Sequence, residues 1–216
     1  ARVGKGTCGV YICNPNNPTS TVVDAAKLKA FVLEASKTAP VFIDEAYIDM
    51  TDAYPADTTG ELVRSGANVV VCKTFSKLHG LAGQRVGYAI MPAAMAAKVR
   101  PRVSGGGMNR LGIVAATASY QDLAFQEEMR LRLIRGRRQM VAMAERLGLA
   151  YAPDPQANFL YVKTGMPNAR FVERMRGEGV LVVGRAFQGY DDWNRICVGQ
   201  DQELAACEAA LKRVMA

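Results

Sequence analysis

Short apolar runs recur along the first half of the chain, and each of them is followed by polar residues. Runs of about four to eight apolar residues are typical of strands buried in a parallel sheet, and apolar residues spaced three or four apart predict helices that cover the sheet. The pattern predicts a helix from Ser20 or Thr21, either of which could cap it, to about Lys37, and another helix over 92–99. It predicts strands at Gly9–Cys13, Val41–Ile43, Val69–Cys72 and Gln84–Met91.

The second half of the chain has a different texture. A nearly continuous helical stretch runs from about Arg110 to Leu147, with bends expected near Tyr120–Asp122 and near Gly136. We therefore predict an α/β part over 1–107, a long interdomain helix over 108–147 and a small α+β domain over 148–216. The elements expected in that last domain are strands at 158–162, 180–183 and 194–198 and helices at 169–176 and 202–215.

A lysine follows the apolar run Val69–Cys72 at the point where the predicted strand ends. Open α/β sheets bind their ligands at the carboxyl ends of their strands, so Lys77 is a candidate nucleophile. The alternative is a solvated charge in a glycine-rich loop. Thr74, Ser76 and Arg85 lie close to it in sequence. Two hydroxyls and a planar guanidinium are suited to holding a phosphate beside that amine.

Polar side chains also follow the two earlier strands. The run ending at Ile43 leads into Asp44 and Tyr47, and a buried carboxylate needs either a backbone cap or a cationic partner. The first strand leads into Asn14–Ser20, where two Asn-Pro steps exclude a helix and fix the directions of the amide side chains. Because three strands deliver polar groups where the chain leaves the sheet, we expect one shared site.

Composition narrows the class of protein. Half of the residues are hydrophobic, which is enough for a core, and no apolar run is long enough to span a bilayer. The net charge is +7, but Lys and Arg are spread along the chain, so we expect no nucleic-acid or membrane partner. Five cysteines without C-x-x-C spacing and a single histidine predict reduced, buried thiols, no metal site and a cytoplasmic protein.

Three motifs, in this order and at these separations, identify a family. NPNNPTS at 14–20, FIDEAY at 42–47 and TFSKLHGLAGQRVGY at 74–88 resemble the fold type I pyridoxal-phosphate aminotransferases. The GLAG-x-R-x-GY form is most similar to the histidinol-phosphate aminotransferase branch. The likeness continues through 158–160 and 194–199 to the end of the chain.

The resemblance implies a role for each candidate residue. Lys77 would bond covalently to the aldehyde of the cofactor, pyridoxal 5′-phosphate, and later move a proton at the substrate Cα. Asp44 would pair with the protonated pyridine nitrogen. Asn17 and Tyr47 would hydrogen-bond the phenolic oxygen of the ring. The phosphate would be held by Thr74, Ser76 and Arg85.

On the substrate side, the resemblance implies that Arg195 grips the α-carboxylate, because a bidentate fork fits a planar carboxylate. Asn158 would support that arginine or the carboxylate, and Arg185 could equally meet the distal group of the substrate or face solvent. His79 is expected to be a loop residue and not a base. Ser20 stands where the family usually has glycine, which predicts an altered turn.

The implied activity is transfer of an amino group from an L-amino acid, or from a phosphorylated amino alcohol such as histidinol phosphate, to a 2-oxo acid. Two alternatives stay open: a decarboxylase of a phosphorylated amino acid, and a non-catalytic aminotransferase-like effector domain of a transcription regulator. The family also carries an N-terminal segment with phosphate-binding and ring-stacking residues, and none is found before Ala1. We therefore expect an aminotransferase fragment that is inactive alone and a homodimer when full length.

Overall fold

The computed structural model describes residues 3–103, 107–183 and 187–215. The chain divides into two compact units, which we call unit 1 (Ala1–Pro15 and Val23–Arg130) and unit 2 (Asn16–Val22 and Leu131–Ala216). The division falls inside a helix and assigns the Asn17 loop to unit 2. The domain boundaries expected at 107 and 147 stay predictions.

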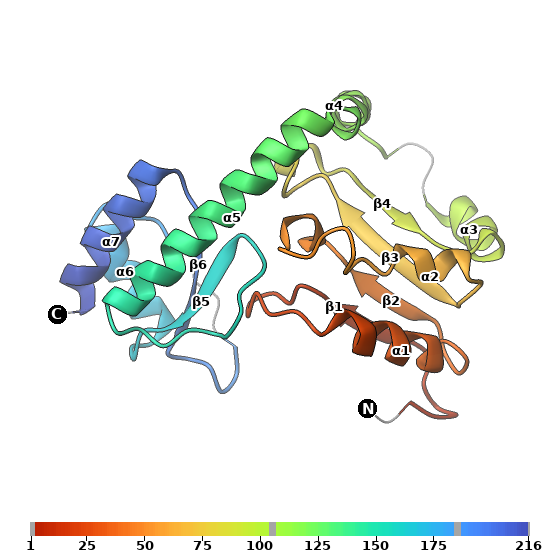
Figure 1. Ribbon diagram of the computed structural model, residues 1–216, viewed down its shortest axis with the longest axis horizontal. Coiled ribbons are helices and arrows are strands. Elements are labelled where there is room, and N and C mark those ends of the chain that lie inside the picture. The colour runs from red at the N-terminus through yellow and green to blue at the C-terminus, as the bar shows by residue number, and fades with distance from the viewer. Residues whose placement is uncertain (1–2, 104–106, 184–186, 216) are drawn as a thin grey trace. The chain divides into compact units, whose positions relative to one another are not determined.

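Unit 1 is built on a sheet of the order β1-β2-β3-β4 (Figure 1). The first three strands are parallel, with Cys13 opposite Asp44 and Asp44 opposite Cys72, and β4 pairs antiparallel with β3. The mostly parallel α/β sheet expected from the sequence is confirmed. The strands are β1 (Val10–Cys13), β2 (Val41–Asp44), β3 (Val69–Thr74) and β4 (Gly87–Ile90).

Helices cover one face of this sheet through a continuous apolar core. The helices α1 (Ala25–Ala35) and α2 (Gly60–Arg64) bury Leu28, Val32 and Leu62 against alternate strand residues such as Val41 and Val69 (Figure 1). The remaining helical elements of unit 1 are η1 (Ile48–Met50), η2 (Ala82–Gln84), α3 (Ala93–Val99), η3 (Arg100–Arg102), α4 (Arg110–Gln121) and the first part of α5 (Leu123–Arg146).

The opposite face of the sheet is less covered. Because side chains alternate along a strand, Tyr11 and Phe42 point away from the α1 core, and they are 67% and 39% exposed. Asp44 follows on the same face, two positions beyond Phe42. The face that carries the candidate carboxylate therefore also carries accessible aromatic side chains.

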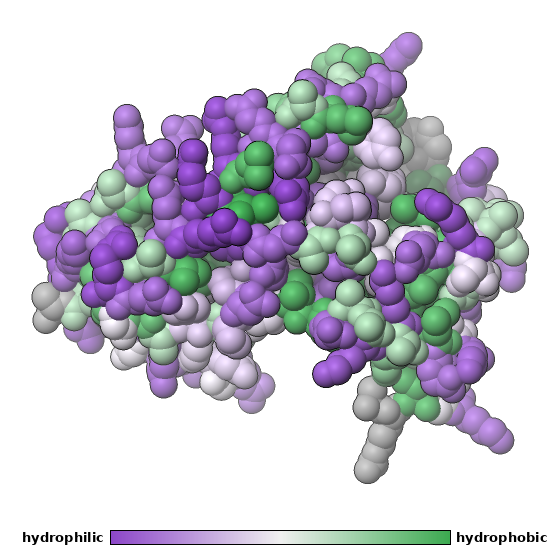
Figure 2. All heavy atoms as spheres, in the orientation of Figure 1, coloured by the Kyte–Doolittle hydropathy of each residue, from purple (hydrophilic) through white to green (hydrophobic). Residues whose placement is uncertain are grey.

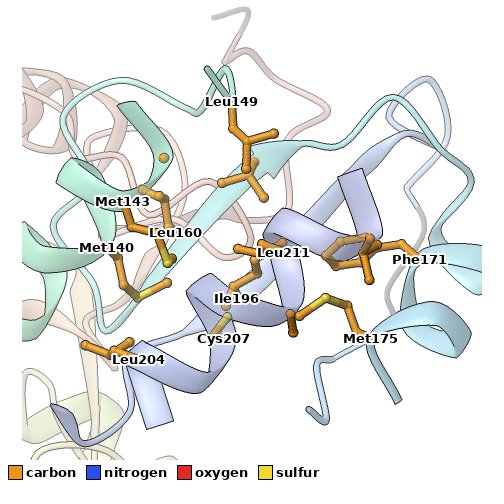
Figure 3. Packing of buried hydrophobic residues seen from close by; sticks show 14 residues of the cluster. Met140, Met143, Leu149, Leu160, Phe171, Met175, Ile196, Leu204, Cys207 and Leu211 are labelled. Atoms are coloured by element: carbon orange, nitrogen blue, oxygen red, sulfur yellow. The ribbon is translucent and has the colours of Figure 1, made fainter. Parts of the chain in front are cut away.

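Unit 2 contains a two-stranded antiparallel sheet with helices. Strands β5 (Phe159–Lys163) and β6 (Trp193–Cys197) pair, with Tyr161 opposite Arg195. Figure 3 shows the core in which Met140, Phe171, Ile196 and Leu211 pack from four different elements. The helices are α6 (Asn168–Gly177), α7 (Asp201–Met215) and the unit 2 part of α5 (Leu123–Arg146).

The long helical stretch is two helices. The α4 helix ends at Gln121, and the Asp122 carboxylate accepts the Phe125 amide, which starts α5 with a new cap. Near Asp122, where a bend was expected, the stretch is divided into two helices, and α5 passes through Gly136 without interruption. Figure 2 shows mostly hydrophilic side chains over α5, as expected for a helix with one solvated face.

Three predictions of local structure are wrong. The first helix is capped by Asp24, whose carboxylate accepts the Lys27 amide at 2.9 Å, and not by Ser20 or Thr21. No strand forms over 180–182, because the Val180 amide instead closes α6 on the Met175 carbonyl; Val183 makes only an isolated bridge. Gln84 ends a 3₁₀ helix, so β4 begins three residues later than expected.

The cysteines are free, but the prediction that they are buried holds only for Cys207. Burial raises the pKa of the Cys207 thiol to about 11. The other four are exposed or half-buried: Cys8, Cys13, Cys72 and Cys197. In the described ranges, no helix is long and apolar enough to cross a membrane, and no group of potential metal ligands is found.

Candidate functional site

The carboxyl ends of β2 and β3 bring part of the predicted site together in unit 1. The two strands are parallel neighbours, and the Glu45 amide donates to the Cys72 carbonyl just beyond their last paired residues. Asp44 therefore ends one strand while Thr74 ends the next. Both belong to the same edge of the sheet, as ligand sites of open α/β sheets do.

The Lys77 amine lies over the ring of Tyr47, with Nζ 5.2 Å from the ring centroid. Tyr47 is 5% exposed, so its position is fixed by the surrounding core. It follows Asp44 by three residues. The fold thus places a half-buried primary amine against a phenol from the segment that carries the candidate carboxylate. A lysine in this position is close enough to an aromatic ring for a cation–π contact.

The hydroxyl and guanidinium groups expected to hold a phosphate are also neighbours. The Arg85 guanidinium donates to the Ser76 hydroxyl at 3.4 Å and to the Ala82 carbonyl at 2.8 Å. Arg85 has a φ of 55°, in the left-handed region, and this turn brings its side chain back toward the strand end. The Thr74 hydroxyl accepts the Ser76 amide at 3.1 Å. These donors suit an anion with several oxygens.

The Asp44 carboxylate is held by two donors from different segments. The Ala46 amide donates to Oδ1 at 3.0 Å, and the Tyr11 phenol of β1 donates to Oδ2 at 2.8 Å. The bond from the Ala46 amide is the backbone cap, one of the two interpretations of Asp44 that the sequence allowed. The second was missed, because the pairing of β1 with β2 is not visible in sequence.

The substrate-side candidates lie in unit 2. Arg195 donates through Nη1 to the Asn17 side-chain oxygen at 2.8 Å, and its guanidinium lies 4.9 Å from the Phe159 ring centroid. Among the residues that the structure describes, the Arg195 Nε is one of four buried side-chain polar atoms without a hydrogen-bond partner. A buried donor left unpaired is unfavourable, so this nitrogen is poised to bind an acceptor.

Asn158 is half-buried and adjoins Phe159, on which the Arg195 guanidinium stacks. Its backbone carbonyl accepts the Val198 amide. Arg185 lies outside the described residues. His79 lies in the turn after Lys77, and its Nδ1 is 2.8 Å from the Ser119 hydroxyl, which agrees with a loop residue held in place.

Ser20 adopts a backbone conformation that favours glycine. Its φ is 65°, and it is fully buried. The hydroxyl accepts the Ala157 amide at 2.7 Å, and the carbonyl accepts the Gln156 amide at 2.7 Å. Ser20 thus adopts a left-handed conformation, and its hydroxyl is used in a buried hydrogen bond. The altered turn expected from the sequence stays a prediction.

The comparison with known families decides the assignment. The family model described as aminotransferase class I and II matches residues 1–213. The chain belongs to this family. The resemblance inferred from the three motifs is thereby confirmed.

Relatives extend the likeness to the histidinol-phosphate branch. The chain is 32% identical over 214 residues to a histidinol-phosphate aminotransferase of Halalkalibacterium halodurans, covering 99% of this chain and 58% of that protein. It is 34% identical to histidinol-phosphate aminotransferase 2 of Carboxydothermus hydrogenoformans, with 99% and 59% covered. The chain therefore spans less than three-fifths of the length of these relatives.

A solved structure shares the fold. The crystal structure of histidinol-phosphate aminotransferase from Sinorhizobium meliloti, in complex with pyridoxal-5′-phosphate, superposes with a TM-score of 0.85 at 30% identity. The match covers 96% of this chain and 57% of that one. The α/β architecture described above is therefore that of an aminotransferase.

Proposed function

We propose that the whole protein carrying this chain is a pyridoxal-phosphate-dependent aminotransferase. It would move an amino group from an L-amino acid, or from a histidinol-phosphate-like amino alcohol, to a 2-oxo acid. The observation that carries this proposal is the position of the Lys77 amine against Tyr47, three residues beyond Asp44 at the end of β2. Substrates would be small molecules, and the active form would be a homodimer.

The residues of unit 1 fit the cofactor in chemical type. The Arg85 guanidinium and the Ser76 and Thr74 hydroxyls would hold its phosphate, and Asp44 would hold the positive charge on its ring nitrogen. When bound, pyridoxal phosphate supplies an electron-withdrawing ring that stabilises negative charge at the substrate Cα. Lys77 Nζ would then act as the base that takes the Cα proton.

The residues of unit 2 fit a carboxylate and a phenolic oxygen. The Asn17 amide uses its oxygen to accept from Arg195, so its NH₂ group is the end available to donate to a ring hydroxyl oxygen. The orphaned Nε of Arg195 would donate to the substrate α-carboxylate. Such a charge-assisted bond contributes about 1.5–3 kcal/mol, and Asn158 would lie beside it.

We propose the same division of labour along the chain as the sequence predicts. The cofactor domain would be 1–107, the connecting helix 108–147 and the small domain 148–216.

The test uses the whole protein with pyridoxal phosphate, a panel of L-amino acids and histidinol phosphate as donors, and a 2-oxo acid as acceptor. Lys77→Ala should abolish formation of the oxo product and the visible absorbance of bound cofactor. Lys37→Ala is the matched control, because Lys37 lies just beyond the end of α1 and both it and its ion-pair partner Glu34 are exposed. An unchanged rate for Lys77→Ala would remove the central assignment.

Product analysis separates the alternatives. Release of carbon dioxide without an oxo product would exclude amino transfer and favour a decarboxylase. Cofactor binding without turnover of any donor would favour the effector domain. Arg195→Lys should raise KM chiefly for donors with an α-carboxylate, because lysine cannot make the bidentate contact; equal losses for amines that lack the carboxylate would contradict that role.

A further inference from the structure

Tyr11 makes a contact that neither the motifs nor the family likeness assigns. It lies in the middle of β1, outside the three motifs, and its phenol donates to Asp44 Oδ2 at 2.8 Å. We propose that Tyr11 is a positioning residue that holds the Asp44 carboxylate for its pairing with the cofactor ring nitrogen. This inference rests on the proposed function.

Strand register makes the contact possible. In the parallel pair β1–β2, Tyr11 is opposite Phe42 and Cys13 is opposite Asp44. Tyr11 and Asp44 therefore share a face of the sheet and are diagonal neighbours, two register positions apart. A tyrosine side chain is long enough to cover that diagonal. A shorter side chain at position 11 would leave Oδ2 without this donor.

The two hydrogen bonds fix the plane of the carboxylate. The Ala46 amide holds Oδ1, and the Tyr11 phenol holds Oδ2. A carboxylate offers about four lone-pair positions, so two acceptor positions stay open for another donor. The amide alone would allow the group to rotate about it, whereas two donors from separate segments define the direction in which the open positions point.

The phenol is a dependable donor at neutral pH. Its hydrogen bond to Asp44, followed by burial, raises the pKa of Tyr11 well above its ordinary value, so the hydroxyl keeps its proton. Tyr11→Phe keeps the ring and removes only the hydroxyl. Losing the hydroxyl should consequently leave folding unchanged, and any effect on the cofactor reports the contact with Asp44.

The experiment is a double-mutant cycle in the whole protein with Tyr11→Phe, Asp44→Asn and the two combined. The probe is pyridoxal phosphate labelled with ¹⁵N in the ring. Two readouts that do not depend on turnover are taken: the dissociation constant, from fluorescence titration of the cofactor-free protein, and the ¹⁵N chemical shift of the bound ring nitrogen. Tyr88→Phe is the matched control, because Tyr88 is a partly exposed tyrosine on the antiparallel strand β4.

We expect Tyr11→Phe to weaken cofactor binding about 3- to 10-fold and to move the ¹⁵N shift toward that of an unprotonated ring. In the Asp44→Asn background, Tyr11→Phe should have no further effect, and Tyr88→Phe should change neither readout. The inference is overturned if Tyr11→Phe leaves both readouts unchanged, or if it weakens binding equally when Asp44 is already replaced.

Failure of the proposed function has a separate signature. A wild-type protein that binds no pyridoxal phosphate, or binds it equally well after Lys77→Ala, would refute the aminotransferase proposal and the role of Tyr11 with it. Binding that depends on Lys77 and Asp44 but not on Tyr11 would refute only the role of Tyr11.

Discussion

A buried ionic cluster beside the candidate site allows a quantitative test of the fold. Glu45 is 1% exposed and accepts three hydrogen bonds of 2.6 Å, from the Thr58 hydroxyl and from the amide and hydroxyl of Thr59. Lys73 Nζ lies 2.7 Å from Asp49 and 3.9 Å from Glu45. Lys73→Met keeps an unbranched side chain that is one heavy atom shorter, and it removes the charge.

The expected loss follows from these distances. At an effective dielectric constant of about 20, two unit charges 2.7 Å apart attract by about 6 kcal/mol, but most of this offsets the cost of burying them. Removing one partner of a buried pair typically costs about 3–5 kcal/mol, because the other charge stays buried. The Asp49 side chain is 16% exposed and can recruit water, so we expect a loss near 3 kcal/mol.

The assay is urea unfolding of the whole protein, followed together with hydrogen exchange of the β3 and α2 amides. Lys37→Met is the control, because its ion pair with Glu34 is exposed and should contribute less than about 1 kcal/mol. A loss below about 1 kcal/mol for Lys73→Met would refute the reasoning, since it would mean that the two carboxylates do not depend on this amine.

Two further predictions concern single contacts. Burial lowers the pKa of His79 below 6.5, so the unfolded chain binds the proton more tightly than the folded chain does. The free energy of unfolding should therefore fall as the pH drops below about 6.5. His79→Gln should flatten this pH dependence, measured by urea unfolding at pH 7.5 and 5.5. A Cβ at Gly136 would clash with Val198 Cγ1, so Gly136→Ala should cost about 1–3 kcal/mol in the same assay. Gly177→Ala, with open space around it, should cost nothing.

The sequence was sufficient where structure is set locally. The runs at 10–12, 41–43 and 69–71 form strands because β-branched residues fit a sheet, and Asp44, Thr74 and Lys77 follow their ends as expected. The antiparallel direction of β4 was not predictable, because an apolar run looks the same in either direction. The cap at Asp24 was missed since three hydroxyl residues precede it and compete for the same role.

Contacts between distant residues could not be predicted from periodicity. Arg195 and Asn17 are 178 positions apart, and their hydrogen bond depends on how β6 and the Asn-Pro loop meet within unit 2. The contact between Tyr11 and Asp44 is of another kind. It follows from the alternation of side chains along a strand once β1 and β2 are known to be parallel neighbours. Assuming the register of β1 and β2 is enough to predict the contact between Tyr11 and Asp44. No such assumption predicts the hydrogen bond between Arg195 and Asn17.

Ser20 shows how a departure from a family pattern can be compensated by a contact. A non-glycine residue in the left-handed region costs about 1–2 kcal/mol, and here the hydroxyl satisfies the buried Ala157 amide at 2.7 Å. Ser20→Ala keeps the strain and leaves that amide unpaired, so it should lose about 1–3 kcal/mol.

The matched variant Ser20→Gly loses the same hydrogen bond but relieves the strain, so its net change should be within about 1 kcal/mol of zero. Thermal unfolding of the whole protein and hydrogen exchange at Ala157 would measure both. The Ser20→Ala variant should be less stable than both the unchanged protein and Ser20→Gly. The Ala157 amide should exchange faster in both variants than in the unchanged protein. If the Ser20→Ala variant were as stable as the unchanged protein, the hydroxyl would contribute nothing, and the backbone hydrogen bonds of Ser20 with Asn16 and Gln156 would be enough to hold the turn.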